Sequence, residues 1–441
     1  MTDLTQIIAQ LRPHLDRRAA TDLLARAVQA ASVTGDEARM VAMLRPEMER
    51  LRLSPEVTDF LPGRANITGR RAGVGQGGAG QGGEGQGGAG QGPDLLLIGH
   101  TDVVHPQDWA AHWAGEPQAD PFGAAVIDGE LWGRGAADLK AGICTALAAL
   151  DLLDRAGIRL AGSVSFAFVG DEESGEPGSG VSAGARAWSD AVRKGDLPRP
   201  DLAVYVEPTR LQVLPVQIGF FIADVTLTGQ SAYFGRPDLG RDALKAAHGV
   251  LQAIWDLSDR LAAEAEHPLL GRANLLVTGL DAGGLIAVPG ECRFSLIGKL
   301  LPGQSLDEAT ARLEATIRAA TPEGIEVAID FPAGRDHPRG GSASGIAADH
   351  ALVTTLSAAL TAVRPDRGGI EGAPFWSEMP FLIERLGIPA VYAAPGDISI
   401  CHTNHERVPL ADYHDAILAF AAFIATTCGT LPGEPGQHQG E

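Results

Sequence analysis

The sequence of 441 residues is poor in cysteine and in positive charge, and it contains no long apolar run. Its four cysteines lie far apart without a CxxC pair, which argues against disulfides or a thiolate zinc site and indicates a reduced, cytoplasmic protein. No apolar run reaches the ~18 residues of a transmembrane helix, and the N-terminus lacks the basic start of a signal peptide. The net charge of −20 argues against nucleic acid or an acidic membrane as a partner.

Four short runs that are apolar throughout are present instead, which indicates a parallel sheet covered by helices on both faces. They read DLLLIGH (94–100), VSFAFVGDEE (164–173), DLAVYVEP (201–208) and GIPAVYAAPGD (387–397). They predict an α/β catalytic domain with a doubly wound, mostly parallel sheet, made from residues 1–211 and 334–430.

A Gly- and Gln-rich segment at residues 73–92 has no side chains that can form a core, so we expect a flexible loop there. It separates ANITGRR from DLLLIGH, which we interpret as two neighbouring strands. Residues 431–441, which include GEPGQHQGE, are expected to form a flexible tail.

The stretch between the third and fourth runs has a different pattern. Strand-like segments at 220–229, 274–280, 291–301 and 325–331 alternate with helical segments at 242–265 and 306–320, the second opened by Ser305. The order βαββαβ predicts a ferredoxin-like domain at residues 212–333, inserted into the first domain.

A histidine or a carboxylate stands at or after the end of each of the four runs, and Asp138 opens the helix after a glycine-rich bend. Because parallel strands end at one edge of a sheet, these side chains can converge. Carboxylates packed together would repel each other unless cations neutralise them. The set predicts two divalent ions, Zn²⁺ first and Co²⁺ or Mn²⁺ as alternatives, held by His100, Asp138, Glu173, Glu207 and His402.

Spacing indicates further roles beside this ligand set. His100 and Asp102 are two residues apart on an extended segment, so the Asp102 carboxylate can accept the free ring N–H of His100 and orient it. Glu172 and Glu173 are adjacent and point in different directions, so one can bind metal while the other acts as the general base. Each residue alone also has a plainer interpretation, as a polar residue at a strand end or as a helix cap.

The motifs GHTDVV, WGRGAADLKAG, GDEESG, EPT and CHTNHE stand in the order of one known family. The sequence resembles the di-zinc metallopeptidase family of acetylornithine deacetylase, succinyl-diaminopimelate desuccinylase, carboxypeptidase G and aminoacylase. The resemblance implies a zinc-peptidase-like catalytic domain with an inserted lid domain that often mediates dimerisation.

The resemblance also implies a role for each matching position. His100 and Glu207 would bind one zinc ion, Glu173 and His402 the other, and Asp138 would bridge both. Glu172 would be the general acid/base and Asp102 the residue that orients His100. The peptide between Asp138 and Leu139 would be cis.

The sequence departs from the family mainly in the lid. Tyr233 stands where the family usually has a histidine that reaches the substrate carbonyl, and Lys299 stands where the family has an arginine. We name Tyr233, Arg236, Arg241 and Lys299 as candidate substrate contacts; each cation is otherwise a solvated surface charge. Trp109, His112 and Trp113 form an aromatic cluster that either borders the cleft or serves packing.

Together these features predict an enzyme that hydrolyses the amide bond of an N-acyl amino acid, using a metal-bridging hydroxide and a glutamate base. A carboxypeptidase or dipeptidase on the same machinery is the alternative, and a non-catalytic homologue that binds metal or amino acid is a third. The expected partner is a small N-acyl amino acid or short peptide, and the resemblance adds a homodimer formed through the lid.

Overall fold

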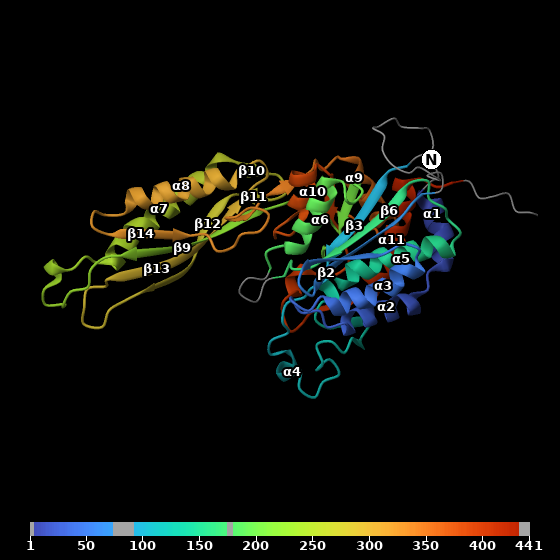
Figure 1. The fold of residues 1–441 in the computed structure, drawn as a ribbon, viewed down its shortest axis with the longest axis horizontal. Helices are drawn as coiled ribbons and strands as arrows, with labels where there is room; N and C mark the ends of the chain where they lie inside the picture. The colour runs from blue at the N-terminus through green and yellow to red at the C-terminus, as the bar shows by residue number, and fades with distance from the viewer. Residues whose placement is uncertain (1–3, 74–91, 174–179, 432–441) are drawn as a thin grey trace, which may run out of the picture. The chain divides into compact units, whose positions relative to one another are not determined.

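The computed structural model describes residues 4–73, 92–173 and 180–431, and the chain forms two compact units (Figure 1). The first unit consists of Met1–Pro215, Ile346–Glu371 and Phe381–Glu441, and the second of Val216–Gly345 and Gly372–Pro380. The predicted loop at 73–92 and the predicted tail at 431–441 lie outside the described residues, except at their ends.

The first unit is built on a sheet in which the four apolar runs lie side by side. Strands β3 (Asp94–His100), β6 (Ser163–Val169), β7 (Leu202–Tyr205) and β18 (Ala390–Tyr392) stand in the order β6-β3-β7-β18, and all pairs are parallel. Every residue of β3 and β6 is buried, as expected for strands covered on both faces. The predicted α/β architecture is therefore confirmed.

One strand neighbour differs from the expectation. β2 (Arg64–Arg71) pairs with β6 and with β1 (Glu56–Leu61), both antiparallel, so β6 lies between β2 and β3. The prediction that ANITGRR and DLLLIGH are neighbouring strands is wrong. A tight hairpin needs a short turn, whereas the long connection between Arg71 and Asp94 leaves another strand free to pair between them.

Helices pack on this sheet and on one another. Helix α5 and helix α11 contact each other and β3, and α6 contacts β1, β2 and β6. The close approach of α5 depends on Gly142, because a Cβ there would lie 2.1 Å from the carbonyl oxygen of Val206. The helices of this unit are α1 (Leu4–Leu11), α2 (Arg17–Gln29), α3 (Ala38–Arg50), α4 (Trp109–His112), α5 (Ala141–Arg155), α6 (Ala183–Lys194), α9 (Ala351–Val363) and α11 (Leu410–Cys428).

A small second sheet in the first unit joins three distant segments. β5 (Glu130–Trp132) pairs antiparallel with both β4 (Ala125–Ile127) and β19 (Arg407–Pro409). The pairing places the residues just before β19 beside those just after β5. It therefore brings the segment that carries His402 to the segment that carries Asp138.

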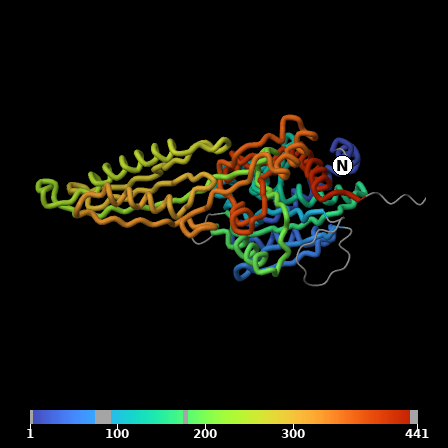
Figure 2. Tube along the Cα trace, turned by 90° about the horizontal axis from the view of Figure 1, so that it is seen from above, coloured from blue at the N-terminus to red at the C-terminus, as the bar shows by residue number. Residues whose placement is uncertain are grey.

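The second unit has the predicted βαββαβ order, and its sheet runs β12-β13-β9-β14, all antiparallel. Figure 2 shows its larger segment, residues 216–345, coloured from green to orange. Its elements are β9 (Gly219–Thr228), α7 (Ala243–Glu264), β10 (Glu266–His267), β11 (Gly271–Arg272), β12 (Asn274–Ala282), β13 (Glu291–Leu300), α8 (Leu306–Ala320), β14 (Glu326–Asp330) and β15 (Gly340–Gly341).

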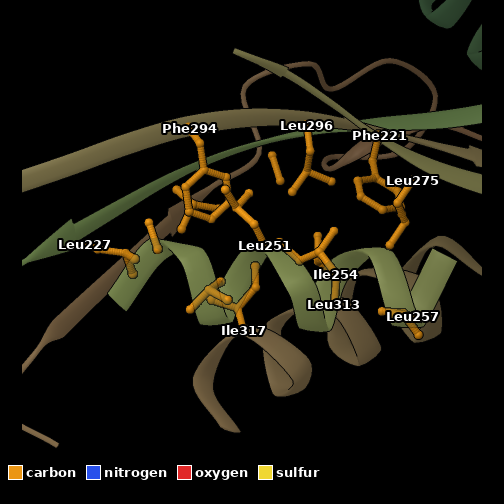
Figure 3. Close-up of a cluster of buried hydrophobic side chains, with 14 of the residues drawn as sticks. Phe221, Leu227, Leu251, Ile254, Leu257, Leu275, Phe294, Leu296, Leu313 and Ile317 are labelled. Atoms are coloured by element: carbon orange, nitrogen blue, oxygen red, sulfur yellow. The ribbon is translucent and has the colours of Figure 1, made fainter. Parts of the chain in front are cut away.

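Both helices of the second unit pack on one face of its sheet. Figure 3 shows Leu251 and Ile254 of α7 and Leu313 of α8 directed at Phe294 and Leu296 of β13. Burial alternates along β13, so its other face is not covered in the same way. The helices begin at side-chain caps, Asp242 for α7 and the predicted Ser305 for α8.

Residues 372–380 group with the second unit although they follow the predicted end of that domain at 333. The Trp376 indole packs against Phe220 and donates a hydrogen bond to the Ser342 carbonyl oxygen at 3.1 Å. The main-chain amide of Ser377 donates to the Gln217 side chain at 3.3 Å. Elements close to the unit boundaries are β8 (Val213–Gln217), β16 (Ser344–Gly345), β17 (Ile370–Ala373) and α10 (Met379–Leu386).

Across the described residues, every helix is too short or too polar to cross a bilayer.

Candidate metal centre

The carboxyl ends of the parallel strands carry the candidate ligands. His100 is the last residue of β3, Glu173 follows β6 and Glu207 follows β7. His402 comes after β18 in a turn, where its φ of 61° lies in the left-handed region. The strand ends meet at one edge because the register pairs His100 with Val169 and Ile98 with Tyr205.

Asp138 reaches the same place from the segment Ala136–Lys140, which precedes α5. The peptide between Asp138 and Leu139 is cis, as the family resemblance implies. Gly135, at φ 82°, makes the left-handed turn that starts this segment, and its carbonyl accepts the Lys140 amide at 3.0 Å.

The two oxygens of the Asp138 carboxylate face different histidines. Oδ1 lies 3.1 Å from Nε2 of His100, which is also 3.7 Å from Oε1 of Glu207. Oδ2 lies 3.3 Å from Nε2 of His402, which is 3.0 Å from Oε1 of Glu173. The five residues therefore form two halves, His100 with Glu207 and Glu173 with His402, which share Asp138.

Burial and charge strongly perturb these groups. Burial, reinforced by the Asp138 charge, raises the pKa of Glu173 to about 8. Hydrogen bonds with Asp138 and Glu173 raise the pKa of His402 to about 11. Burial also opposes ionisation of Asp138, but hydrogen bonds from the two imidazoles outweigh it and hold the pKa of Asp138 below its usual range.

This arrangement fits divalent cations. Three carboxylates that are at most 6% exposed converge on two imidazoles, and ligand atoms of His100, Asp138 and Glu173 all lie within 4.8 Å of one another. Burial raises the pKa of the neighbouring Cys401 thiol well above its usual range, so this thiol stays protonated. A set of oxygen and imidazole donors without thiolate suits two zinc, cobalt or manganese ions.

Asp102 differs in detail from the expectation. Nδ1 of His100 donates to the main-chain carbonyl oxygen of Asp102 at 2.9 Å, while the carboxylate lies 3.9 Å away. The Asp102 carboxylate accepts the amide of Glu173 at 3.0 Å and the Thr34 hydroxyl at 3.0 Å. Asp102 thus orients the ring through its backbone, which leaves Nε2 of His100 facing Asp138, and it holds the turn that carries Glu173.

Glu172 directly precedes the candidate ligand Glu173 in the turn after β6. Its amide hydrogen-bonds to the Asp102 carboxylate at 3.3 Å, and it is more exposed than Glu173. Burial lowers the pKa of His100, but the Asp138 hydrogen bond and then the Glu207 and Glu172 charges outweigh it. The result is a pKa of His100 well above its usual value.

The motifs contained two supporting residues to which the sequence reasoning assigned no role. The buried Glu406 carboxylate accepts the amides of Ala137 at 3.1 Å and Asp138 at 3.0 Å. Its other oxygen lies 2.5 Å from the guanidinium of Arg134, which is 2% exposed. Both residues stand in motifs of the sequence, Arg134 in WGRG and Glu406 at the end of CHTNHE. They do not follow one of the four apolar strands, so the position of the strand ends does not identify them.

The four candidate substrate contacts lie in the second unit. Tyr233 is 64% exposed and packs against the Phe234 ring. Arg236 pairs with Asp238 at 2.8 Å, and Arg241 donates to the Gly324 carbonyl oxygen at 3.2 Å. Lys299 donates to the carbonyl oxygen of Leu270 at 2.6 Å. The three cations thus have partners within their own unit.

Comparison with known proteins gives a consistent result. A family profile described as peptidase family M20/M25/M40 matches residues 96–426. An acetylornithine deacetylase of Myxococcus xanthus is 30% identical over 341 residues, 76% of this chain and 80% of that protein. A succinyl-diaminopimelate desuccinylase of Methylobacterium nodulans is 35% identical over 209 residues, 46% of this chain and 49% of that protein.

Solved structures agree on the fold. A tripeptidase from Staphylococcus aureus has a TM-score of 0.70 at 15% identity and covers 94% of this chain and 99% of its own. At that identity the likeness concerns the fold alone.

Proposed function

The chain belongs to peptidase family M20/M25/M40, a metal-dependent hydrolase family, and we propose that it is a dinuclear amidohydrolase that cleaves N-acyl amino acids. The observation that carries the proposal is the Asp138 carboxylate, which presents one oxygen to His100 and the other to His402. The acetylornithine deacetylase, similar over most of this chain, supports an acylated amino acid as the substrate class.

Two divalent ions would be held by the two halves of the centre, one by His100 and Glu207, the other by Glu173 and His402, with Asp138 between them. When bound, such ions polarise a carbonyl group and lower the pKa of bound water. Zinc is our first choice, with cobalt or manganese as alternatives.

The side chains around the ions supply proton transfer and orientation. Glu172, near the ligands but outside the set, takes the proton of the attacking water and delivers it to the leaving nitrogen. The Asp102 carbonyl keeps His100 in one tautomer, and the Asp102 carboxylate fixes the turn of Glu172 and Glu173.

The second unit is proposed to act as a lid and as a dimerisation surface. Tyr233 would donate a hydrogen bond to the substrate carbonyl in place of the family histidine. The edge strand β12 exposes Leu276 by 59% and Leu280 by 53%, which supports a homodimer formed along this edge. Light scattering of the purified chain measures the dimer, and Leu276→Lys should shift it toward monomer.

The four cysteines are unpaired and buried, and this supports a reducing compartment such as the cytoplasm.

A substrate panel tests the proposal. N-acetyl and N-succinyl amino acids and unblocked dipeptides are each assayed after chelation and re-addition of Zn²⁺, Co²⁺ or Mn²⁺. Turnover of the acylated amino acids in preference to dipeptides supports the deacylase. A preference for dipeptides assigns the chain to a peptidase on the same machinery, and metal binding without any turnover assigns it to a non-catalytic homologue.

A further inference from the structure

The turn that carries His402 is held on its N-terminal side by short-range hydrogen bonds, in which the Ile400 and Cys401 amides donate to the Asp397 and Ile398 carbonyl oxygens at 3.2 and 3.3 Å. The His402 side chain is 53% exposed, in contrast to the buried His100 at 1%. Within the turn, the Thr403 hydroxyl donates to the Ile400 carbonyl oxygen at 2.7 Å and accepts the His405 amide at 3.1 Å. These bonds fix the turn locally, and the position of the imidazole depends in addition on what holds the residues that follow it.

Trp113, which directly follows α4, contacts the residues that come after His402. Its indole N–H donates to the Asn404 carbonyl oxygen at 2.6 Å. The same ring meets His405 edge to face at 5.2 Å and Trp132 of β5 at 5.5 Å between centroids. Trp113 thus combines a short hydrogen bond and one ring contact on this turn with a second ring contact on β5.

Glu406 holds the other end of the segment against the opposite half of the centre. Its carboxylate accepts the Asp138 amide at 3.0 Å, and its carbonyl accepts the Gly133 amide at 3.2 Å. Residues 402–406 therefore connect a ligand of one half of the centre, His402, to the residue that the two halves share. A displacement at Asn404 would move His402 against Glu173, while His100 at the end of β3 and Glu207 just after β7 stay in place.

We propose that Trp113 is a positioning residue that sets the affinity of the His402–Glu173 half of the centre for its metal ion. The inference rests on the dinuclear centre proposed above. Trp113 acts through the Asn404 carbonyl oxygen and through its contact with the His405 ring. Outer-shell partners of metal ligands typically alter metal affinity by about 10–100-fold, and we expect a loss in this range.

The test is Trp113→Phe, which keeps a ring for packing and removes the donor N–H. Chelated protein is titrated with Zn²⁺ by calorimetry and with Co²⁺ by absorption spectroscopy. We expect one equivalent to bind as in the unaltered chain, the other to bind about 10–100-fold more weakly, and the visible Co²⁺ spectrum of that equivalent to change.

Trp109→Phe is the matched control. Trp109 lies four positions earlier, and its indole N–H also donates to a main-chain carbonyl oxygen, that of Gln118 at 2.8 Å, outside the His402 turn. The Arg134 guanidinium lies 5.6 Å from the Trp109 ring, and phenylalanine keeps a ring for that contact. Both equivalents should bind to this variant as they do to the unaltered chain. His405→Leu, at an exposed position, keeps the indole hydrogen bond and removes the ring contacts with Trp113 and His112, so it should weaken the same equivalent by a smaller factor.

His402→Ala assigns the affected equivalent. Adding Trp113→Phe to His402→Ala should not further weaken the ion that remains. The inference is overturned if Trp113→Phe binds both ions with unaltered affinity, or if Trp109→Phe weakens the same equivalent equally. Should Trp113→Phe not fold, unaltered affinity in His405→Leu overturns it. An unaltered chain that binds fewer than two ions contradicts the dinuclear centre itself, a result distinct from the other three.

Discussion

The Glu406 carboxylate accepts the main-chain amide of Asp138 at 3.0 Å, so the residue shared by the two halves of the centre is held by its backbone as well as by its side chain. The same carboxylate is paired with the buried guanidinium of Arg134. Burial raises the pKa of Glu406, even with that cation beside it. The pair therefore supports the backbone of Asp138, a candidate metal ligand.

Glu406→Gln should destabilise the protein strongly. It keeps an acceptor for the two amides but leaves the Arg134 charge buried without its counter-charge, which typically costs about 3–5 kcal/mol. Calorimetry should show a clearly lower Tm. The control is Glu49→Gln, which breaks an exposed helical pair with Arg45 at 3.2 Å and should leave the Tm unchanged. Equal Tm values for the two variants would show that the buried pair contributes nothing.

The strands that bear the ligands could be predicted from the sequence because they are buried on both faces. β3 and β6 read as continuous apolar runs, so the residue at which each run ends is visible without a structure. The convergence of His100 and Glu173 then follows from parallel strand geometry.

The supporting contacts could not be predicted in this way. Glu406 follows a polar turn, and nothing local indicates that its carboxylate turns inward to Arg134. The hydrogen bond of His100 to the Asp102 backbone involves an atom that every residue has, so no sequence pattern records it. Trp376 joins the second unit through packing with Phe220, a tertiary contact between residues far apart in the chain.

Glu172→Gln should abolish most turnover and leave metal binding intact. Glu172 is proposed to move the proton, and loss of a general base typically costs about 10²–10⁴-fold in kcat. Steady-state kinetics on the best substrate of the panel, with metal analysis of the same sample, measures both effects. Glu173→Gln is the contrasting variant, because it should lower the metal content as well. Undiminished turnover by Glu172→Gln would remove Glu172 from the mechanism.

The metal-free protein should lose stability as the pH rises. Hydrogen bonds to Asp138 and Glu173 raise the pKa of His402 to about 11, and burial raises the pKa of Glu173 to about 8. A group whose pKa is higher in the folded state than in the unfolded state stabilises the fold at pH values below its unfolded-state pKa. This contribution is lost as the pH rises through its folded-state pKa. The Tm of chelated protein should therefore fall between pH 6.5 and 9.

Metal-loaded protein is the reference for that experiment, since bound cations replace the ring protons as partners of the carboxylates. Its Tm should stay level or rise over the same pH range. The chelated His402→Gln variant should show a shallower fall than the chelated unaltered chain. A parallel fall in all three samples would assign the pH effect to other groups.

The number of metal ions per chain tests the central claim most directly. Chelated protein is reloaded with Zn²⁺, dialysed, and its zinc content is measured by mass spectrometry. The Asp138→Asn variant is treated in the same way, because a neutral amide there replaces the carboxylate that faces both His100 and His402. We expect two zinc ions per unaltered chain and at most one in the variant. A single ion or none in the unaltered chain, or two equally tight ions in Asp138→Asn, would contradict a dinuclear centre built around Asp138.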